Sequence, residues 1–264
     1  MLVAHPAEAE AETVAAGPRG RYLYAIVDGP FDPHPLGFAG IDGAEVYTLP
    51  DGPIAAVVSD LPDRKVRPER RRLAAHHEVM RRLMAERTVL PMAFGLIADG
   101  PESVHRILRL NHDAFEEQLG RLRNRVEMGL RVTWDVPNIF EYILGRHRDL
   151  AEYRDRIFRG GREPSQDEKI ELGRSFDRLL TEDREAAVER VRRALDPRCD
   201  AIVVNRIRDE RDVMNLACLV DRDAIKDFET GVVDAARGFN NDYAFDFNGP
   251  WPPHNFVDVE LKLS

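Results

Sequence analysis

The sequence predicts an α+β protein of two domains, the second a modified ferredoxin-like (βαββαβ) domain with extra helices in its first crossover. The chain has 264 residues, whereas a single domain commonly holds about 100–150. Strand-like and helix-like runs are mixed along its whole length, and after residue 125 their order is β-α-β-β-α-β, the split βαβ pattern. We therefore expect a disordered tail over residues 1–20, an N-terminal α+β domain over 21–124 and a C-terminal domain over 125–264.

The first domain begins with strands. Residues 22–28, YLYAIVD, are apolar on both faces, which is typical of a central strand. A proline-rich loop follows. Two strand-like runs, EVYTL at 45–49 and IAAVVSDL at 54–61, then flank a Pro-Asp-Gly-Pro turn signal. This arrangement predicts a β-hairpin.

Two helices and one more strand complete the first domain. Residues 68–86 have apolar side chains at helical spacing, and Pro68 suits the first helical position. The packed stripe of this helix is expected to hold Leu73, His77, Met80 and Met84. VLPMAFGLI, 89–97, predicts a strand that Pro91 confines to a sheet edge or a bulge. A second helix is expected from Pro101 onward.

The second domain starts with the most regular strand pattern in the sequence. In residues 126–134, VEMGLRVTW, every second residue is apolar, which predicts that five side chains face one core. They are Val126, Met128, Leu130, Val132 and Trp134. The remaining expected elements are two helical blocks at 136–159 and 166–195, strands at 199–207 and 213–220, a helix at 223–237, and strands at 241–247 and 257–263.

A proline-rich knot, Asn-Gly-Pro-Trp-Pro-Pro, separates the last two expected strands. A Pro-x-x-Pro segment such as 250–253 is a ligand for partner domains when it lies in a disordered region. Here it lies between alternating strand-like runs, which favours a corner whose Trp251 packs into the domain. A position at a domain junction is also open, because tryptophan suits a site with one dry and one polar side.

Composition excludes several classes of protein. The formal net charge is −9, which argues against general affinity for nucleic acid. Two cysteines, Cys199 and Cys218, are too few for a disulfide framework, and their spacing fits no zinc motif. No apolar run approaches the ~20 residues that span a bilayer, so no membrane span is expected. The first 20 residues do not resemble a signal peptide, and a cytoplasmic location is expected.

Sequence motifs for catalysis or cofactor binding are missing. Neither phosphate-loop fingerprint occurs, nor does the Gly-x-Ser-x-Gly motif of hydrolases. The pair His76-His77 has methionine at position 80, where a helical metal site would place its next ligand. One histidine is therefore expected on the packed stripe and the other on its shoulder. We expect no enzyme activity, no metal and no cofactor.

A basic run, RKVRPERRR at 64–72, is the strongest local charge pattern. Its cations form a candidate docking patch for an acidic partner or nucleic acid, and they are Arg64, Lys65, Arg67, Arg70, Arg71 and Arg72. Positive charge at a helix N-terminus opposes the helix dipole, which favours a functional role. The alternative is a solvated surface whose charges are partly paired, which is the usual role of such runs.

Five stretches resemble the gas vesicle proteins GvpF and GvpL, in the order of that family and across nearly the whole chain after residue 20. They are RYLYAIV, VLPMAFG, VEMGLRV, MNLACLVDRDAIKDF and FNGPWPPHNFV. The matching positions, which we expect to be structural, are Leu90, Pro91, Phe94, Gly95, Glu127, Gly129, Asn215, Gly249, Pro250, Trp251, Pro252, Pro253 and Phe256. Departures at Ala93, Met128 and His254-Asn255 leave the choice between the F and L branches open.

This resemblance implies an accessory protein of gas vesicle formation, without enzymatic activity or cofactors. Its expected partners are the main shell protein GvpA, which is small, apolar and self-polymerising, and other Gvp accessory proteins. The resemblance also implies two α+β domains, the second modified ferredoxin-like, and an association with gas vesicles. An exposed apolar surface or a sheet edge in either domain is the expected contact. A ferredoxin-like small-molecule-sensing or regulatory module is the alternative function.

Overall fold

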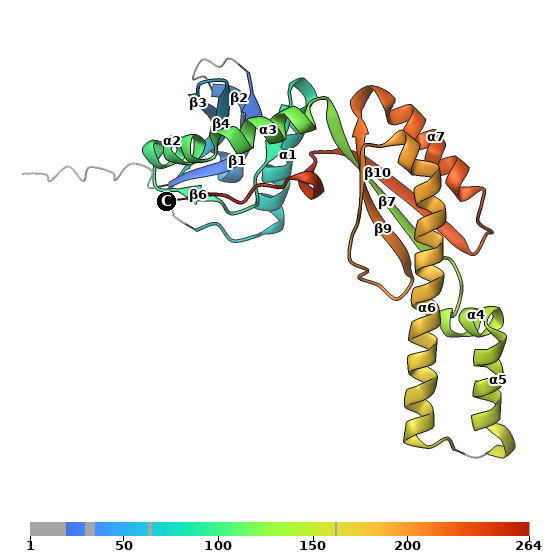
Figure 1. The fold of residues 1–264 in the computed structure, drawn as a ribbon. Helices are drawn as coiled ribbons and strands as arrows, with labels where there is room; N and C mark the ends of the chain where they lie inside the picture. Colours follow the sequence, from blue (N-terminus) through green and yellow to red (C-terminus); the bar gives the residue numbers. More distant parts are fainter. Residues whose placement is uncertain (1–19, 30–34, 63–64, 162, 264) are drawn as a thin grey trace, which may run out of the picture. The chain divides into compact units, whose positions relative to one another are not determined.

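The computed structural model describes residues 20–29, 35–62, 65–161 and 163–263 (Figure 1). It is an α+β protein with two antiparallel sheets. Of the tail expected over residues 1–20, residues 1–19 lie outside the described residues.

The chain forms two compact units. The first comprises Met1–Arg82, Met92–Glu116 and Glu260–Ser264, and the second comprises Leu83–Pro91 and Glu117–Val259. The boundary expected between residues 124 and 125 stays a prediction.

The first sheet has the strand order β2-β3-β4-β1-β5, and β6 pairs with β1. Its strands are β1 (Gly20–Asp28), β2 (Pro35–Ala39), β3 (Glu45–Asp51), β4 (Ile54–Leu61), β5 (Val89–Pro91) and β6 (Ile97–Ala98). The accompanying helices are α1 (Arg70–Glu86), α2 (Pro101–Leu110) and α3 (His112–Leu122). The predicted hairpin is confirmed, since Asp51 of β3 pairs with Ile54 of β4. The central position of β1 is also confirmed, because it pairs with β4 and is buried along most of its length.

Three local expectations for this half were wrong. The stretch 89–97 is two short strands, because the chain turns between them at Gly95, whose φ of +92° lies outside the strand region. The helix expected from Pro101 is divided at Asn111, which has a non-helical φ of −117°. The proline-rich loop contains β2, an irregular edge strand whose Gly37 has a φ of +73°.

The packed face of α1 also differs from the expectation, because His76 is buried and His77 is exposed. The buried residues recur at helical spacing, as His76, Val79, Met80, Leu83 and Met84. The His76 Nδ1 atom lies 2.9 Å from the hydroxyl of Tyr22 in β1. A hydrogen bond to a buried tyrosine therefore compensates for placing this polar ring in the core.

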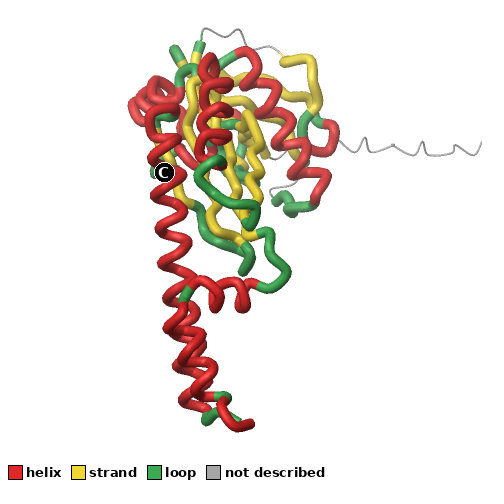
Figure 2. Tube along the Cα trace, turned by 90° about the vertical axis from the view of Figure 1, so that its right-hand side faces the viewer, coloured by secondary structure: helices red, strands yellow, loops and turns green. Residues whose placement is uncertain are grey.

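The second sheet has the order β10-β7-β9-β8, with helices against one face (Figure 2). Its strands are β7 (Arg125–Trp134), β8 (Ala201–Val204), β9 (Asp212–Asp221) and β10 (Tyr243–Trp251), and its helices are α4 (Ile139–Arg146), α5 (Arg148–Ile157), α6 (Gln166–Leu195) and α7 (Ile225–Ala236). The five alternating residues from Val126 to Trp134 are all buried, as predicted. The guanidinium of Arg184 in α6 lies 5.3 Å from the centre of the Trp134 ring, so this row faces α6.

The helix α6 is 30 residues long and extends past the sheet, where its N-terminal half lies beside α4 and α5 (Figure 1). Its start is fixed by a capping box, since the Ser165 hydroxyl accepts from the Glu168 N–H and the Glu168 carboxylate accepts from the Ser165 N–H. The helical block expected over 136–159 is two helices, because the chain leaves helical geometry at His147.

The expected closing strand at 257–263 was wrong, because this segment joins no sheet. Side-chain amides bind its backbone instead. The Asp258 N–H donates to Gln118 Oε1 at 3.2 Å, and the Lys262 N–H donates to Asn111 Oδ1 at 2.8 Å. Asn111 Nδ2 returns a 2.8 Å hydrogen bond to the Lys262 carbonyl. A side-chain amide of α3 and one from the junction between α2 and α3 thus satisfy backbone groups that a neighbouring strand would otherwise pair.

Candidate interaction surface at the edge strand β10

The strand β10 forms one edge of the second sheet and pairs only with β7 among the described strands. It continues through Gly249 and Pro250 to Trp251, with an irregularity between Asn248 and Trp251. The segment Gly249–Trp251, which was expected to form a corner between two strands, is therefore part of β10. This correction has a local cause: Gly249 adopts a φ of +128°, which lets the chain bulge and then pair again at Trp251.

Trp251 is 45% exposed, so the expectation that it packs into the domain was wrong. It pairs with Glu127, which points to the sheet face opposite the core row of Val126 and Met128. The indole consequently cannot enter the core beneath α6. Phe247 on the same edge strand is 39% exposed, but it pairs with Leu130 of the core row and therefore points to the other face of the sheet.

The Trp251 indole is held in place although it is exposed. Its Nε1–H donates to Asn248 Oδ1 at 2.6 Å. The Asn248 side chain lies over Gly129 of β7, where an added Cβ would come within 2.8 Å of the same oxygen. Gly129 therefore makes room for the amide that orients the indole. A Cβ at Gly249 would similarly meet Met128 Sδ at 2.8 Å.

Glu127 fixes the chain that follows Trp251. Its carboxylate accepts from the Asn255 backbone N–H at 2.8 Å and from Asn255 Nδ2 at 2.6 Å. The side chain is buried, and this burial raises the pKa of the Glu127 carboxyl, although the two hydrogen bonds act against the rise. Pro252, Pro253 and Phe256 of this following segment are also buried.

The structure brings eight of the thirteen motif positions together around β10. They are Glu127, Gly129, Gly249, Pro250, Trp251, Pro252, Pro253 and Phe256. Sequence reasoning gave no functional role to Phe247, Asn248 or Asn255, because alternation alone does not show which side chains of an edge strand are exposed. Asn248 and Trp251 face one side of the sheet, and Phe247 faces the other. We call Phe247, Asn248 and Trp251 the β10 edge surface.

The other five motif positions lie on other strands and turns. Leu90 and Pro91 belong to β5, and Phe94 and Gly95 to the turn that follows it. The Gly95 N–H donates to the Tyr22 hydroxyl at 3.1 Å, which ties this turn to β1. Asn215 lies in β9, and its carbonyl accepts from the Asn205 N–H at 2.7 Å. Backbone contacts of this kind fit a structural role.

The basic run lies at the start of α1, although Arg64 is outside the described residues. Arg72 Nη2 lies 2.8 Å and Arg71 Nη2 3.6 Å from the Asp42 carboxylate, and both arginines also contact Glu69. The hydrogen bond from Arg72 lowers the pKa of Asp42. Part of the positive charge is therefore compensated locally. A docking role for Arg64, Lys65, Arg67, Arg70, Arg71 and Arg72 stays a prediction.

A second exposed apolar surface lies at the opposite edge of the same sheet, between α6 and β8. Its groove has a volume of about 320 Å³. Its apolar lining residues are Val188, Val204, Ile207, Val213 and Met214, and charged side chains from α6 surround them. Val204 is 50% exposed. Sequence reasoning missed this groove because it is built by residues far apart in the chain.

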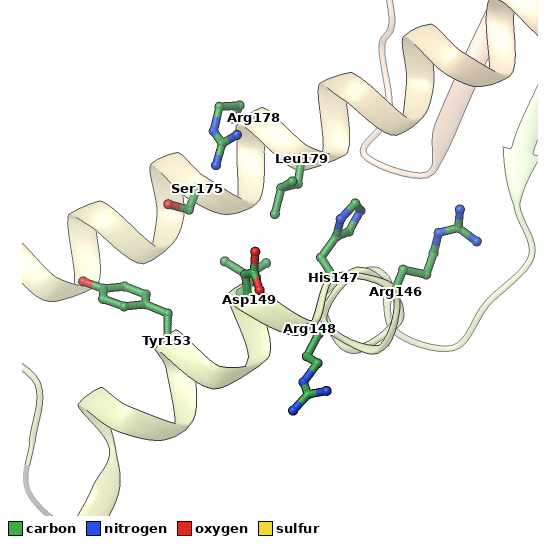
Figure 3. A pocket seen from close by; sticks show the side chains of 9 residues that line it. Arg146, His147, Arg148, Asp149, Tyr153, Ser175, Arg178 and Leu179 are labelled. Atoms are coloured by element: carbon green, nitrogen blue, oxygen red, sulfur yellow. The ribbon is translucent and has the colours of Figure 1, made fainter.

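A cavity of about 380 Å³ lies among α4, α5 and α6 (Figure 3). Its cationic lining residues already have partners. Arg146 and His147 contact Asp183 at 3.2 and 3.1 Å, and Arg178 contacts Glu182 at 3.2 Å. Because these cations are engaged within the helices, the cavity does not present an open anion site.

Neither a cluster of metal-binding side chains nor a membrane-spanning helix occurs in the described parts of the chain. No group of three or more histidine, cysteine, aspartate or glutamate side chains is arranged there to hold a metal ion. In the same residues, no helix combines the length and apolarity needed to cross a membrane.

The comparison with known proteins decides the family. The model of the family described as gas vesicle synthesis protein GvpL/GvpF matches residues 20–258. The chain belongs to the GvpL/GvpF family. It is 28% identical to gas vesicle protein F of Streptomyces sp. (strain CB03234) over 253 residues, which cover 90% of this chain and 99% of the relative. It is also 28% identical to gas vesicle protein L of the same strain over 263 residues, or 91% and 94% of the two chains.

The fold of this GvpL/GvpF-family chain is likewise similar to a solved one. The crystal structure of GvpF from Anabaena sp. PCC7120 superposes with a TM-score of 0.80 at 24% identity, covering 92% of this chain and 99% of that one. Similarity to both F and L proteins does not separate the two branches. The chain thus belongs to a family of gas vesicle synthesis proteins and not to a known enzyme family.

Proposed function

We propose that this chain is an accessory protein of gas vesicle assembly that binds the main shell protein GvpA, with other Gvp accessory proteins as further partners. The observation that carries the proposal is the β10 edge surface. An edge strand with two exposed aromatic side chains offers both backbone hydrogen bonds and apolar contact area to another chain.

The proposed contact is strand addition along β10. An extended segment of the partner would pair with the outer backbone of Tyr243–Asn248, before the irregularity at Gly249. Trp251 on one face of the sheet and Phe247 on the other would then contact apolar side chains on the two faces of the added strand. Aromatic residues are enriched among those that dominate binding energy, because they bury a large area at low entropic cost.

This mode suits the task of an assembly helper. A small, apolar, self-polymerising shell protein aggregates unless its apolar surface is covered before it joins the growing wall. The many charged residues of the helper, 85 of 264, keep the resulting complex in solution. A helper of this kind needs no catalytic residue and no cofactor, and we place it in the cytoplasm in association with gas vesicles.

The second unit is proposed to be a modified ferredoxin-like domain. Its four strands are numbered in chain order from β7 to β10, and their spatial order corresponds to 4-1-3-2 with all neighbours antiparallel. That order supports the split βαβ pattern. The helices α4, α5 and α6 all lie in the first crossover. The proposed domain limits are 21–124 and 125–264.

Co-expression with GvpA tests the proposed function. We expect an affinity-tagged full chain to retain GvpA during purification, and deletion of its gene to reduce the number of vesicles seen by electron microscopy. Vesicles of normal number and shape after deletion, in a strain without a second family member, would contradict the assembly role. A full chain that never retains GvpA would contradict the proposed partner.

A further inference from the structure

The only two cysteines of the chain, Cys199 and Cys218, lie on neighbouring segments of the second sheet. Cys199 follows α6 through the short turn Asp196–Arg198 and immediately precedes β8. Cys218 lies in the middle of β9, the partner strand of β8. The fold thus brings together two thiols that are 19 positions apart in the sequence.

A bulge places both side chains on the same face of the sheet. Leu219 pairs with Ala201, and its carbonyl also accepts from the Asp200 N–H at 2.8 Å, so two residues oppose one. Cys199 consequently points to the side of the sheet that carries α6, where its Sγ–H donates to the Leu195 carbonyl at 3.1 Å. Cys218 pairs with Met128, a member of the core row on that same side.

The two thiols differ in solvent exposure and in the direction in which their pKa is shifted. Cys199 is half-buried, whereas Cys218 is fully buried. A hydrogen bond from Cys218 lowers the pKa of the Cys199 thiol, and the same contact, together with burial, raises the pKa of Cys218. The accessible thiol is therefore the one that more readily becomes a nucleophilic thiolate.

We propose that Cys199 and Cys218 form a reversible intramolecular disulfide when hydrogen peroxide oxidises Cys199. The Cys199 thiolate attacks peroxide, so an S–O bond forms, the O–O bond breaks and hydroxide leaves as water with the proton that Cys199 released. The Cys218 sulfur then attacks the sulfenic acid of Cys199. The S–S bond forms, the S–O bond breaks, and the leaving hydroxide takes the Cys218 proton to become a second water.

This disulfide would link the C-terminal end of α6 to the centre of β9. It would close a short loop that contains β8, and so restrict the unfolded chain more than the folded one. The oxidised protein should therefore melt at a higher temperature than the reduced protein. A thiol reductant reverses the modification by thiol–disulfide exchange. None of these steps depends on a contact with the shell protein.

Peroxide treatment of the purified full chain tests the proposal. We expect both free thiols to disappear, the intact monomer to lose the mass of two hydrogen atoms, and the tryptic peptides 199–206 and 212–222 to be recovered as one cross-linked species. Dithiothreitol should restore both thiols and the lower melting temperature.

Two variants test whether Cys199 is oxidised first and Cys218 then attacks it. In Cys218→Ala, Cys199 should stop at the sulfenic acid, which dimedone traps, whereas in Cys199→Ser the buried Cys218 should remain a free thiol. The proposal is overturned if the wild type keeps both thiols under these conditions. It is equally overturned if peroxide yields over-oxidised Cys199 or disulfide-linked dimers instead of the internal cross-link.

Discussion

Glu127 of β7 and Asn255 are joined by two hydrogen bonds, one from the Asn255 backbone at 2.8 Å and one from its side chain at 2.6 Å. The pair connects residues 128 positions apart and holds the chain that leaves β10 against the sheet. Charged hydrogen bonds of this geometry are stronger than neutral ones. The buried carboxylate of Glu127 therefore fixes the chain that follows the exposed Trp251.

Replacing Asn255 by alanine removes the side-chain donor and leaves the buried carboxylate with fewer partners. We expect Asn255→Ala to lower the free energy of unfolding by about 1.5–3 kcal/mol, the range for a hydrogen bond to a charged group. Urea denaturation measures this difference. Glu260→Ala, at an exposed position of the same segment, is the matched control and should change it by no more than about 0.5 kcal/mol.

The pH dependence of stability reports on Glu127. Burial raises the pKa of its carboxyl above the ordinary value of 4.5, so the folded state holds the proton more tightly than the unfolded state. The stability that this group contributes is complete below about pH 4.5 and is lost as the pH rises through the folded pKa.

Subtracting the unfolding free energy of Glu127→Gln from that of the wild type isolates this group. The difference should fall as the pH increases above 4.5. A difference that grows with pH would mean that the hydrogen bonds from Asn255 outweigh burial, and that the folded pKa is lowered.

Gly249 allows the bulge that returns β10 to the sheet. Alanine there would have to adopt a φ of +128° and place its Cβ 2.8 Å from Met128 Sδ and 3.0 Å from the Glu127 carbonyl oxygen. We expect Gly249→Ala to destabilise the fold by about 1–3 kcal/mol, the cost of a strained backbone position. Thermal and chemical unfolding both measure this.

Gly145 in α4 provides the opposite control, because a Cβ there meets nothing within 4 Å. Gly145→Ala should stabilise the protein by about 0.5–1 kcal/mol, since alanine loses less backbone freedom in a helix. Equal destabilisation by the two substitutions would remove the conformational argument for Gly249.

The elements that were predicted correctly from the sequence are those whose pattern has a single period. The alternation from Val126 to Trp134 and the turn between β3 and β4 are local signals, and both elements form as expected. The stretch 89–97 was misread because apolar composition does not show that Gly95 leaves the strand region. His77 was preferred over His76 because neighbouring residues on a helix differ by only 100° in direction.

The candidate site was harder to predict because it depends on contacts between distant residues. The motif positions were visible in the sequence, but the exposure of Trp251 follows from its register with Glu127. The roles of Asn248 and Asn255 follow from the space over Gly129 and from the carboxylate of Glu127. No local period reports such relationships.

The exposure of Trp251 predicts a small effect on folding. Trp251→Ala removes a partly exposed ring and one hydrogen bond to Asn248, which should cost about 1–2 kcal/mol. The same change at a buried aromatic residue typically costs about 3–5 kcal/mol. A melting curve distinguishes the two outcomes, and a loss in the larger range would show that Trp251 is part of the core.

Binding of GvpA to variants of the two sheet edges tests the central claim most directly. Full-length Phe247→Asp and Trp251→Ala would be compared with Val204→Asp, which alters the groove at the opposite edge. The β10 variants should each weaken GvpA retention by at least about tenfold, as expected for aromatic residues that dominate an interface, while Val204→Asp binds like the wild type. Wild-type binding by both β10 variants, with or without a loss in Val204→Asp, would contradict the account.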